Sequence, residues 1–373
     1  MGDFRIGSIL GFEIRLDFSW FIIFFLILWV FTFAVFPVNY PGLSIGAYIG
    51  MGVVGTLLFF ASLLAHEISH SLVARTKGIP VEGITLFIFG GMSRTRQEAE
   101  TPGDEFQIAA VGPFSSLIIA GLFWGAAWLA LQARWSLAIV GVAQYLALLN
   151  LLLAVFNLLP GFPLDGGRIF RAAVWKSTGD YTKATRWSTT GGKWLAYILI
   201  AFGLLSVFQG NLGGLWLVLI GWFLRNAAIA SYQQHLLQQV LEHVRARDAM
   251  TPDPETVEPD LTLQELVDEH FLRRRYHAFP VATDGRPLGL ISLRQVKEVP
   301  REEWPHRTVA ETMTSVEGDG VTVRPDEPMT EVLRKMERSG SRRVLVTRDG
   351  RLEGIITTGD VAGWLQRARE LEG

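Results

Sequence analysis

No cysteine occurs among the 373 residues of this chain, so disulfide bonds and thiolate metal ligands are excluded. A metal site would therefore need histidine, aspartate, glutamate or water as ligands. The 34 Lys and Arg residues nearly balance the 36 Asp and Glu residues, which indicates no nucleic-acid partner. No apolar run precedes Asp17, so we expect no cleavable signal peptide.

Charge is also scarce over most of the chain. We count 26 charged residues in the first 243 positions and 44 in the last 130. This division predicts an α-helical polytopic membrane part followed by a soluble part. Crossing the hydrocarbon core takes about 20 apolar residues. Six candidate spans result: 18–36, 46–74, 106–133, 135–156 and the two halves of 194–224, which QGNLGG at 209–214 divides.

The basic residues are unevenly shared among the loops. Most of them lie in the N-terminal segment, in the loop after the second span and in the loop after the fourth. Because basic loops stay on the cytoplasmic side, this pattern predicts a multi-pass protein of the cell membrane with both termini in the cytoplasm.

The second span holds two histidines and a glutamate in a run, Ser44 to Ala74, that has no other charge. They form the motif His66-Glu67-Ile68-Ser69-His70, or HExxH. On a helix the two histidines project from one face and can bind one Zn²⁺, with Glu67 beside them as a base for water. A carboxylate at membrane depth is costly without partners, so we interpret the motif as a zinc site rather than a chance match.

Catalytic zinc uses three protein ligands and one open position, so a third ligand is needed. The candidate is Asp165 in FNLLPGFPLDGGRIFR, residues 156–171. The second and fourth spans both run toward the cytoplasm, which brings Asp165 to a depth similar to that of the histidines. The alternative is an ordinary turn or N-cap aspartate before Gly166.

Between the second and third spans, the segment VEGITLFIFGGMSRTRQ (81–97) is rich in β-branched and aromatic residues. It predicts a short strand or hairpin near the cytoplasmic face. Unpaired strand backbone cannot face lipid, so this segment must pack against the helices or line a cavity.

The soluble part contains an internal repeat. Residues 248–270 parallel 311–336, and 279–296 parallel 344–361. The pattern predicts a tandem duplication of one β-α-β-β-α unit, with hairpin turns at TDG and RDG. We therefore expect a membrane domain at 1–232, a helical connector at 233–246, and two repeats at 247–305 and 306–373.

HEISH together with NLLPGFPLDGGR resembles the site-2 protease family of intramembrane zinc metalloproteases. The resemblance implies that His66, His70 and Asp165 bind one zinc ion and that Glu67 is catalytic. It also implies that Asn157 helps to hold the substrate or the oxyanion. The substrate would be a transmembrane segment of another protein, cut in regulated intramembrane proteolysis.

The same resemblance extends to the predicted strand. The family has a membrane-associated strand ending in glycines, which is thought to take the substrate as an added strand. Phe89, Gly90 and Gly91 match its end and are the implied substrate-binding residues. One departure is that many members place an Asn shortly after a Gly-Pro pair, where this chain reads GPFSS at 112–116.

The soluble repeat resembles a pair of cystathionine-β-synthase (CBS) domains, which often bind adenine nucleotides (ATP, ADP or AMP). The second copy matches the family's G-h-h-T-x-x-D pattern with Thr357 and Asp360, whereas the first has Gln295 in place of the acid. The resemblance implies at most one good nucleotide site and a homodimer formed through these domains. The alternative is a structural dimerisation module in which the carboxylate caps a helix.

The leading hypothesis is an intramembrane zinc endopeptidase, embedded in the lipid bilayer and modulated by an adenine nucleotide. A CBS-regulated channel or transporter is the alternative, although no other predicted span carries an acidic residue to line an ion path. A catalytically silent membrane scaffold is a further alternative, against which the intact HExxH and LDG motifs argue.

Overall fold

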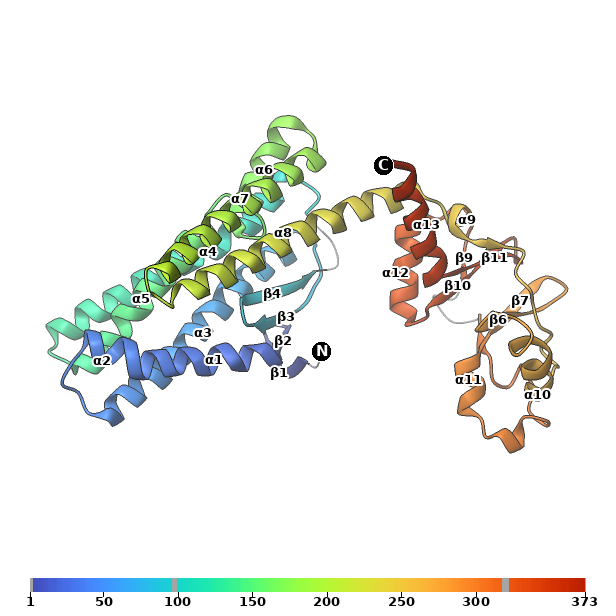
Figure 1. Cartoon of the computed structure of the whole chain (residues 1–373), viewed down its shortest axis with the longest axis horizontal. Coiled ribbons are helices and arrows are strands. Elements are labelled where there is room, and N and C mark those ends of the chain that lie inside the picture. Colours follow the sequence, from blue (N-terminus) through green and yellow to red (C-terminus); the bar gives the residue numbers. More distant parts are fainter. Residues whose placement is uncertain (1–2, 96–98, 317–321, 373) are drawn as a thin grey trace. The chain divides into compact units, whose positions relative to one another are not determined.

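Figure 1 shows the computed structural model of the chain, which describes residues 3–95, 99–316 and 322–372. The chain divides into two units, Met1–Gln233 and Gln234–Gly373. The first unit consists of long helices and one small sheet, and the second of short strands and helices. The predicted fold class, a helical membrane part followed by an α/β repeat, is confirmed.

Six helical segments of the described chain are long and apolar enough to cross a membrane, as predicted. They are Phe18–Asn39 (α1 Phe18–Val30, a π-helical turn and α2 Phe36–Asn39), α3 (Ile45–Thr76), α4 (Pro102–Gln132), α5 (Leu137–Asn157), α7 (Tyr181–Phe208) and Gly214–Leu241 of α8 (Gly214–His243). A shorter amphipathic helix, α6 (Asp165–Thr178), lies between α5 and α7 in chain order.

Two helices begin earlier than the hydropathy pattern predicted. α7 begins at Tyr181, because the Asp180 carboxylate caps it by accepting a hydrogen bond from the backbone N–H of Lys183. α4 begins at Pro102 and therefore includes Glu105, so the expectation that no other span carries an acidic residue was wrong. Charged residues that we assigned to loops form the first turns of these helices.

Four strands form one sheet in the first unit, in the order β1 (Asp3–Ile9), β2 (Phe12–Asp17), β3 (Val81–Phe87) and β4 (Gly90–Thr95). β2 and β3 are parallel, and both hairpins are antiparallel. The β3–β4 hairpin was predicted. The β1–β2 hairpin was not, and its turn has positive φ at Leu10 and Gly11. β4 is an edge strand, so one side of its backbone has no strand partner within the described residues.

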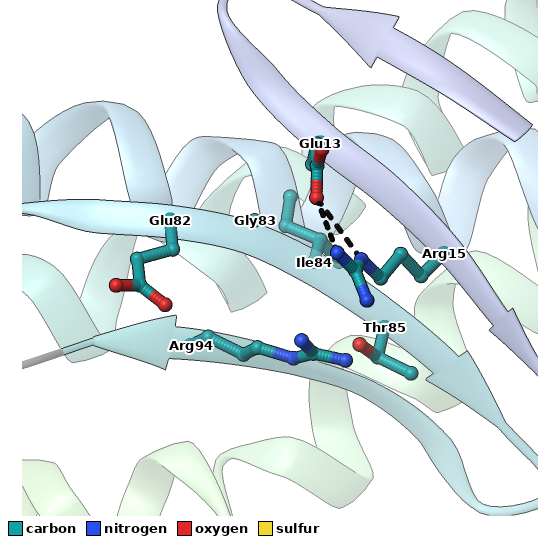
Figure 2. A pocket seen from close by; sticks show the side chains of 7 residues that line it. All are labelled: Glu13, Arg15, Glu82, Gly83, Ile84, Thr85 and Arg94. Carbon is teal, nitrogen blue, oxygen red and sulfur yellow. Dashed lines mark hydrogen bonds and ion pairs between the residues drawn. The ribbon is translucent and has the colours of Figure 1, made fainter. Parts of the chain in front are cut away.

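The two faces of this sheet differ in character. One face is apolar and packs on α3; its contacts join Phe12, Ile14, Leu16, Ile84 and Leu86 to Leu64, Ile68 and Leu72. The sheet also carries a pocket with charged walls, lined among others by Glu13, Arg15, Glu82 and Arg94 (Figure 2). Because Leu64 and Leu72 flank the HExxH motif and Ile68 lies within it, the apolar face holds the sheet against the part of α3 that carries the motif.

The described residues of the second unit form two sheets. One has the order β5 (Thr251–Pro252), β11 (Arg351–Thr357), β10 (Arg343–Arg348) and β9 (Thr322–Val323), and the other β6 (Ala278–Thr283), β7 (Arg286–Ser292) and β8 (Thr314–Ser315). The helices are α9 (Ala246–Ala249), α10 (Leu263–Glu265), α11 (Leu293–Glu298), α12 (Met329–Ser339) and α13 (Thr358–Glu372). Both predicted hairpin turns are present, with positive φ at Asp284-Gly285 and Asp349-Gly350.

The two copies of the repeat exchange their first strands. β5 precedes the first copy's hairpin but pairs with β11 of the second copy. β8 belongs to the second copy but pairs with β7 of the first. The duplication is as predicted, yet the copies interlock, because a sequence repeat does not specify which sheet edge a strand joins.

Candidate metal centre

The helix α3 places the HExxH side chains inside the helical bundle. His66 and His70 are 2% and 7% exposed, and their rings meet edge to face with centroids 4.9 Å apart. Their Nε2 atoms lie 3.2 Å from each other. The spacing of four residues puts both rings on one face of the helix, as the motif requires.

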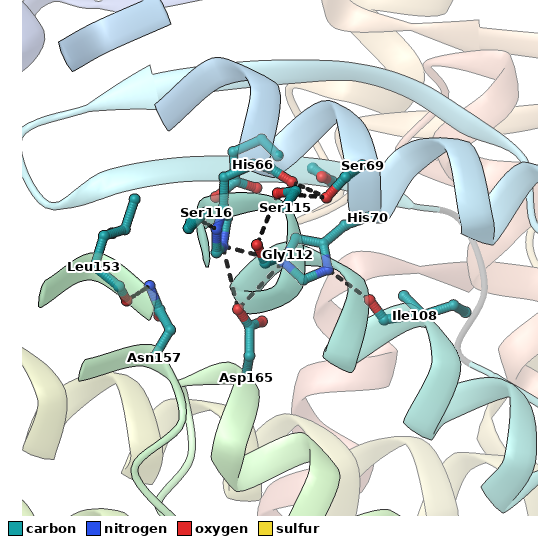
Figure 3. Close-up of polar contacts among 12 residues, drawn as sticks. His66, Ser69, His70, Ile108, Gly112, Ser115, Ser116, Leu153, Asn157 and Asp165 are labelled. Carbon is teal, nitrogen blue, oxygen red and sulfur yellow. Dashed lines mark hydrogen bonds and ion pairs between the residues drawn. The ribbon is translucent and has the colours of Figure 1, made fainter. Parts of the chain in front are cut away.

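Asp165, the first residue of α6, meets the two histidines from the other side (Figure 3). Its Oδ2 atom lies 3.2 Å from the Nε2 atoms of both His66 and His70. The three ligand atoms all lie within 4.8 Å of one another, and no other such His, Asp or Glu group occurs in the described ranges. Residues 99 positions apart in sequence thus converge on one point.

The remaining imidazole nitrogens are fixed by α4. The Nδ1 atom of His70 lies 2.6 Å from the carbonyl oxygen of Ile108, which can only accept, so Nδ1 carries the proton. The Nδ1 atom of His66 lies 2.9 Å from the Ser116 hydroxyl. With the proton on Nδ1, the His70 ring directs its Nε2 lone pair toward Asp165, as a metal ligand does, and the Ser116 hydroxyl holds the ring of His66 in place.

The surroundings fit a zinc ion held by three protein ligands. A Cβ atom at Gly112 would lie 2.1 Å from Nε2 of His70 and 2.8 Å from Nε2 of His66, so only glycine leaves this space open. Two neutral imidazoles and one carboxylate are a zinc donor set with a fourth position left for water or substrate.

Glu67 lies against the edge strand of the sheet. A Cβ atom at Gly91 would come within 2.3 Å of the Glu67 Cγ atom and 2.7 Å of its carboxyl carbon. The glycine in β4 therefore allows the strand backbone to approach the carboxylate closely. Sequence reasoning proposed roles for both residues but not their contact.

The chain before Asp165 is held by close backbone approaches. A Cβ atom at Gly192 of α7 would lie 1.9 Å from the Phe162 carbonyl oxygen, and one at Gly166 would lie 2.2 Å from that of Leu158. The Ser188 hydroxyl donates to the Gly167 carbonyl at 2.6 Å. These contacts explain the glycines of LDGGR, since the loop folds back on the first turn of α6 with no room for side chains.

Other predicted site residues lie near this centre with different contacts. The Asn157 amide donates to the Leu153 carbonyl of its own helix at 3.0 Å (Figure 3). Phe89 stacks on Phe223 of α8, with ring centroids 4.0 Å apart. Gly90 has a φ of 141°, which suits glycine at the hairpin turn. Roles for Asn157, Phe89 and Gly90 in substrate binding stay predictions.

Comparison with known proteins decides the family. The sequence model of peptidase family M50 matches residues 54–134 and 129–205, and that of the CBS domain matches residues 246–302 and 309–367. Rip3 of Mycobacterium tuberculosis, which is named as a zinc metalloprotease, is 38% identical over 363 residues, covering 96% of this chain and 91% of Rip3. The chain belongs to peptidase family M50, the site-2 proteases.

Two further relatives of this M50 protease come from Methanocaldococcus jannaschii. Zinc metalloprotease MJ0392 is 33% identical over 332 residues, covering 88% of this chain and 90% of MJ0392. The solved structure of a site-2 protease from this organism is 28% identical, covers 62% of this chain and 95% of that one, and has a TM-score of 0.43. The family matches identify a multi-pass membrane zinc metalloprotease with a CBS domain pair.

In the CBS pair of this M50 protease, Asp360 caps a helix. Its carboxylate accepts from the Thr357 backbone N–H at 2.8 Å, the Thr357 hydroxyl at 2.7 Å and the Thr251 hydroxyl at 3.1 Å. Ser292 and Gln295 form the equivalent capping box in the first copy. The structure shows the capping role that the sequence offered as the alternative, and nucleotide binding by Thr357 and Asp360 stays a prediction.

Sequence reasoning missed the α4 residues that support the M50 metal centre. Ile108 acts through its backbone carbonyl, for which a sequence gives no signal. Gly112 and Ser116 lie in GPFSS, which was noted only as a departure from the family pattern. Ser116 lies one helical turn after Gly112 in α4. Its hydroxyl group contacts the imidazole ring of His66.

Proposed function

We propose that this M50 protease is an intramembrane zinc endopeptidase that cuts transmembrane segments of other membrane proteins. The observation that carries the proposal is the convergence of His66, His70 and Asp165 on one point within a bundle of apolar helices. In this proposal the three residues hold zinc and Glu67 is the general base. Asn157 and the hairpin segment 89–91 bind the substrate.

Glu67 supplies the proton transfers of the reaction. A zinc ion held at the centre would polarise the scissile carbonyl and lower the pKa of water to about 7. The Glu67 carboxylate takes the proton of the attacking water and delivers it to the departing amine. Glu67 follows His66 directly in the motif, and its carboxylate lies against Gly91 of the edge strand.

The edge strand β4 offers a binding mode for an unwound substrate. A transmembrane helix engages its carbonyl groups in its own hydrogen bonds, so it must unwind before cleavage. The free side of β4 can pair with an extended segment, which compensates for the helical hydrogen bonds that are lost. Because Gly91 contacts Glu67, a segment added near this residue would pass close to the general base.

We further propose that the catalytic centre opens toward the cytoplasm and that both termini are cytoplasmic. The segment between the fourth and fifth spans carries Arg168, Arg171 and Lys176, a basic composition that is typical of cytoplasmic loops. Asp165 begins the helix that carries these residues, so the centre lies near that face. Water has its shortest route from that side.

The test compares metal content with cleavage in purified variants reconstituted into membranes with a transmembrane substrate. Glu67→Gln should retain zinc and lose cleavage, because it removes the base and leaves the ligands intact. His66→Ala and Asp165→Asn should lose both. Cleavage by Glu67→Gln, or zinc content that is unchanged in Asp165→Asn, would contradict the proposal.

For the second unit we propose that the CBS pair forms a homodimer and binds an adenine nucleotide that modulates cleavage. Support comes from the CBS family match and from the Thr357 and Asp360 pattern. A nucleotide would have to share or displace the hydrogen bonds that Asp360 now accepts. The domain boundaries proposed above, at 232, 246 and 305, belong to the same proposal.

Nucleotide binding is tested by calorimetric titration of the full chain with ATP, ADP and AMP. Thr357→Val should abolish binding, and Ser292→Val, the equivalent change in the first copy, should leave it intact. Equal binding by both variants would exclude the site at Thr357. The mass of the purified protein in detergent, measured with and without nucleotide, tests the dimer.

A further inference from the structure

A buried ion pair, Glu105 with Arg171, lies outside the proposed catalytic machinery. Glu105 is 1% exposed and Arg171 is 6% exposed. The Arg171 Nε atom donates to Glu105 Oε1 at 2.7 Å, and its Nη2 atom donates to the same oxygen. A buried ion pair is seldom more stabilising than apolar side chains of similar volume. We therefore look for a role of this pair in positioning its neighbours.

Arg171 joins three segments that surround Asp165. It belongs to α6, six residues after the aspartate, and its partner Glu105 is on α4. Its guanidinium also lies over two rings, 5.4 Å from the centroid of Phe162 and 4.8 Å from that of Tyr181. Phe162 is in the loop before Asp165, and Tyr181 begins α7. One side chain thus fixes the start of α6 relative to its neighbours.

The partner of Arg171 lies on the same face of α4 that holds the histidines. Glu105, Ile108, Gly112 and Ser116 follow one another at spacings of three or four residues and are all buried. Ile108 and Ser116 hold the rings of His70 and His66. α4 packs along both α3 and α6, which make few direct contacts with each other. The distance between the histidines and Asp165 is therefore set through α4.

We propose that Glu105 and Arg171 are positioning residues which hold Asp165 at the metal centre, and that zinc affinity depends on their pairing. This inference rests on the proposed function, because it takes Asp165 to be a zinc ligand. Without the pair, α6 loses its charged attachment to α4 and Asp165 is free to move away from the two imidazoles.

The test measures zinc affinity of the full-length protein by competition with a chelator, together with the visible spectrum after Co²⁺ substitution. Arg171→Met should weaken zinc binding by about 10- to 100-fold, the range found when outer partners of metal ligands are removed. Arg171→Lys keeps the charge but not the planar fork, so an intermediate affinity is expected. Lys176→Met is the matched control, since Lys176 is an exposed basic residue on the same helix, and it should bind zinc normally.

The double variant Glu105→Met with Arg171→Met separates positioning from charge burial. It leaves no unpaired charge in the interior, so it should fold, which circular dichroism and gel filtration in detergent verify. Weakened zinc binding and a Co²⁺ spectrum resembling that of Asp165→Asn support the proposal. Wild-type zinc affinity and a wild-type spectrum in the double variant would overturn the positioning role of the pair but not the zinc assignment. Wild-type affinity in Asp165→Asn would overturn the zinc assignment as well.

Discussion

The imidazole rings of His66 and His70 owe their orientation to single atoms on α4. The Ile108 carbonyl and the Ser116 hydroxyl engage the Nδ1 atoms of His70 and His66. Gly112 lies between these two positions in the sequence, where the helix backbone faces both Nε2 atoms. α4 therefore provides hydrogen bonds at Ile108 and Ser116 and open space at Gly112. We expect even small substitutions at these positions to change the orientation of the two rings.

Gly112→Ala is expected to weaken zinc binding. The added methyl group would lie 2.1 Å from His70 Nε2, so the ring must rotate out of line with Asp165. We expect a loss of about 10- to 100-fold in affinity, as for other perturbations around metal ligands. Zinc competition measures it. Gly121→Ala on the same helix, where a Cβ atom meets nothing within 4 Å, is the control and should bind zinc normally.

Gly91→Ala is expected to separate catalysis from metal binding. Its methyl group would lie 2.3 Å from the Glu67 Cγ atom and would displace the carboxylate, while the zinc ligands keep their places. A misplacement of about 1 Å can cost about 100-fold in rate. Cleavage rate and zinc content are measured in parallel. Gly7→Ala in β1, where a Cβ atom meets nothing within 4 Å, is the control and should cleave normally. Unchanged cleavage in Gly91→Ala would refute the assigned role of Glu67.

At the scale of elements, the positions of most helices and strands could be predicted from the sequence, whereas the pairing of one strand with another could not always be. The six spans and the β3–β4 hairpin follow from apolar runs and from β-branched residues before Gly90-Gly91. The β1–β2 hairpin is short, and its pairing with β3 joins residues about seventy positions apart, such as Ile14 and Ile84. Alternation within a strand shows which face is buried, but it contains no information on the neighbouring strand.

The close approach of α7 to the loop before Asp165 can be tested with Gly192→Ala. Its methyl group would lie 1.9 Å from the Phe162 carbonyl oxygen, and backbone cannot rotate aside as a side chain can. Overpacking of this kind costs about 1–3 kcal/mol. We expect a lower melting temperature and reduced zinc content, measured by thermal unfolding and metal analysis. Thr190→Ala, an exposed position on the same helix, should change neither quantity.

At the scale of the whole molecule, zinc is expected to stabilise one unit selectively. The ligands lie in the unit Met1–Gln233, and the CBS pair has separate apolar cores. A ligand at 100 times its dissociation constant stabilises the folded state by about 2.7 kcal/mol. Hydrogen exchange with and without a chelator should show zinc-dependent protection in residues 62–74, 105–116 and 158–170. Protection confined to residues 247–372 would contradict the location of the site.

The sequence by itself determined the membrane part, the repeat and the identity of the candidate zinc ligands. These features reside in composition, periodicity and motif spacing, which are properties of the chain before it folds. Only the tertiary structure decided that His66, His70 and Asp165 meet with their Nε2 and Oδ2 atoms 3.2 Å apart. It also decided that Ile108, Gly112 and Ser116 of α4 lie against the two imidazoles, and that Glu105 pairs with Arg171. Such support depends on backbone carbonyls, missing side chains and buried pairing between distant helices, which local sequence does not encode.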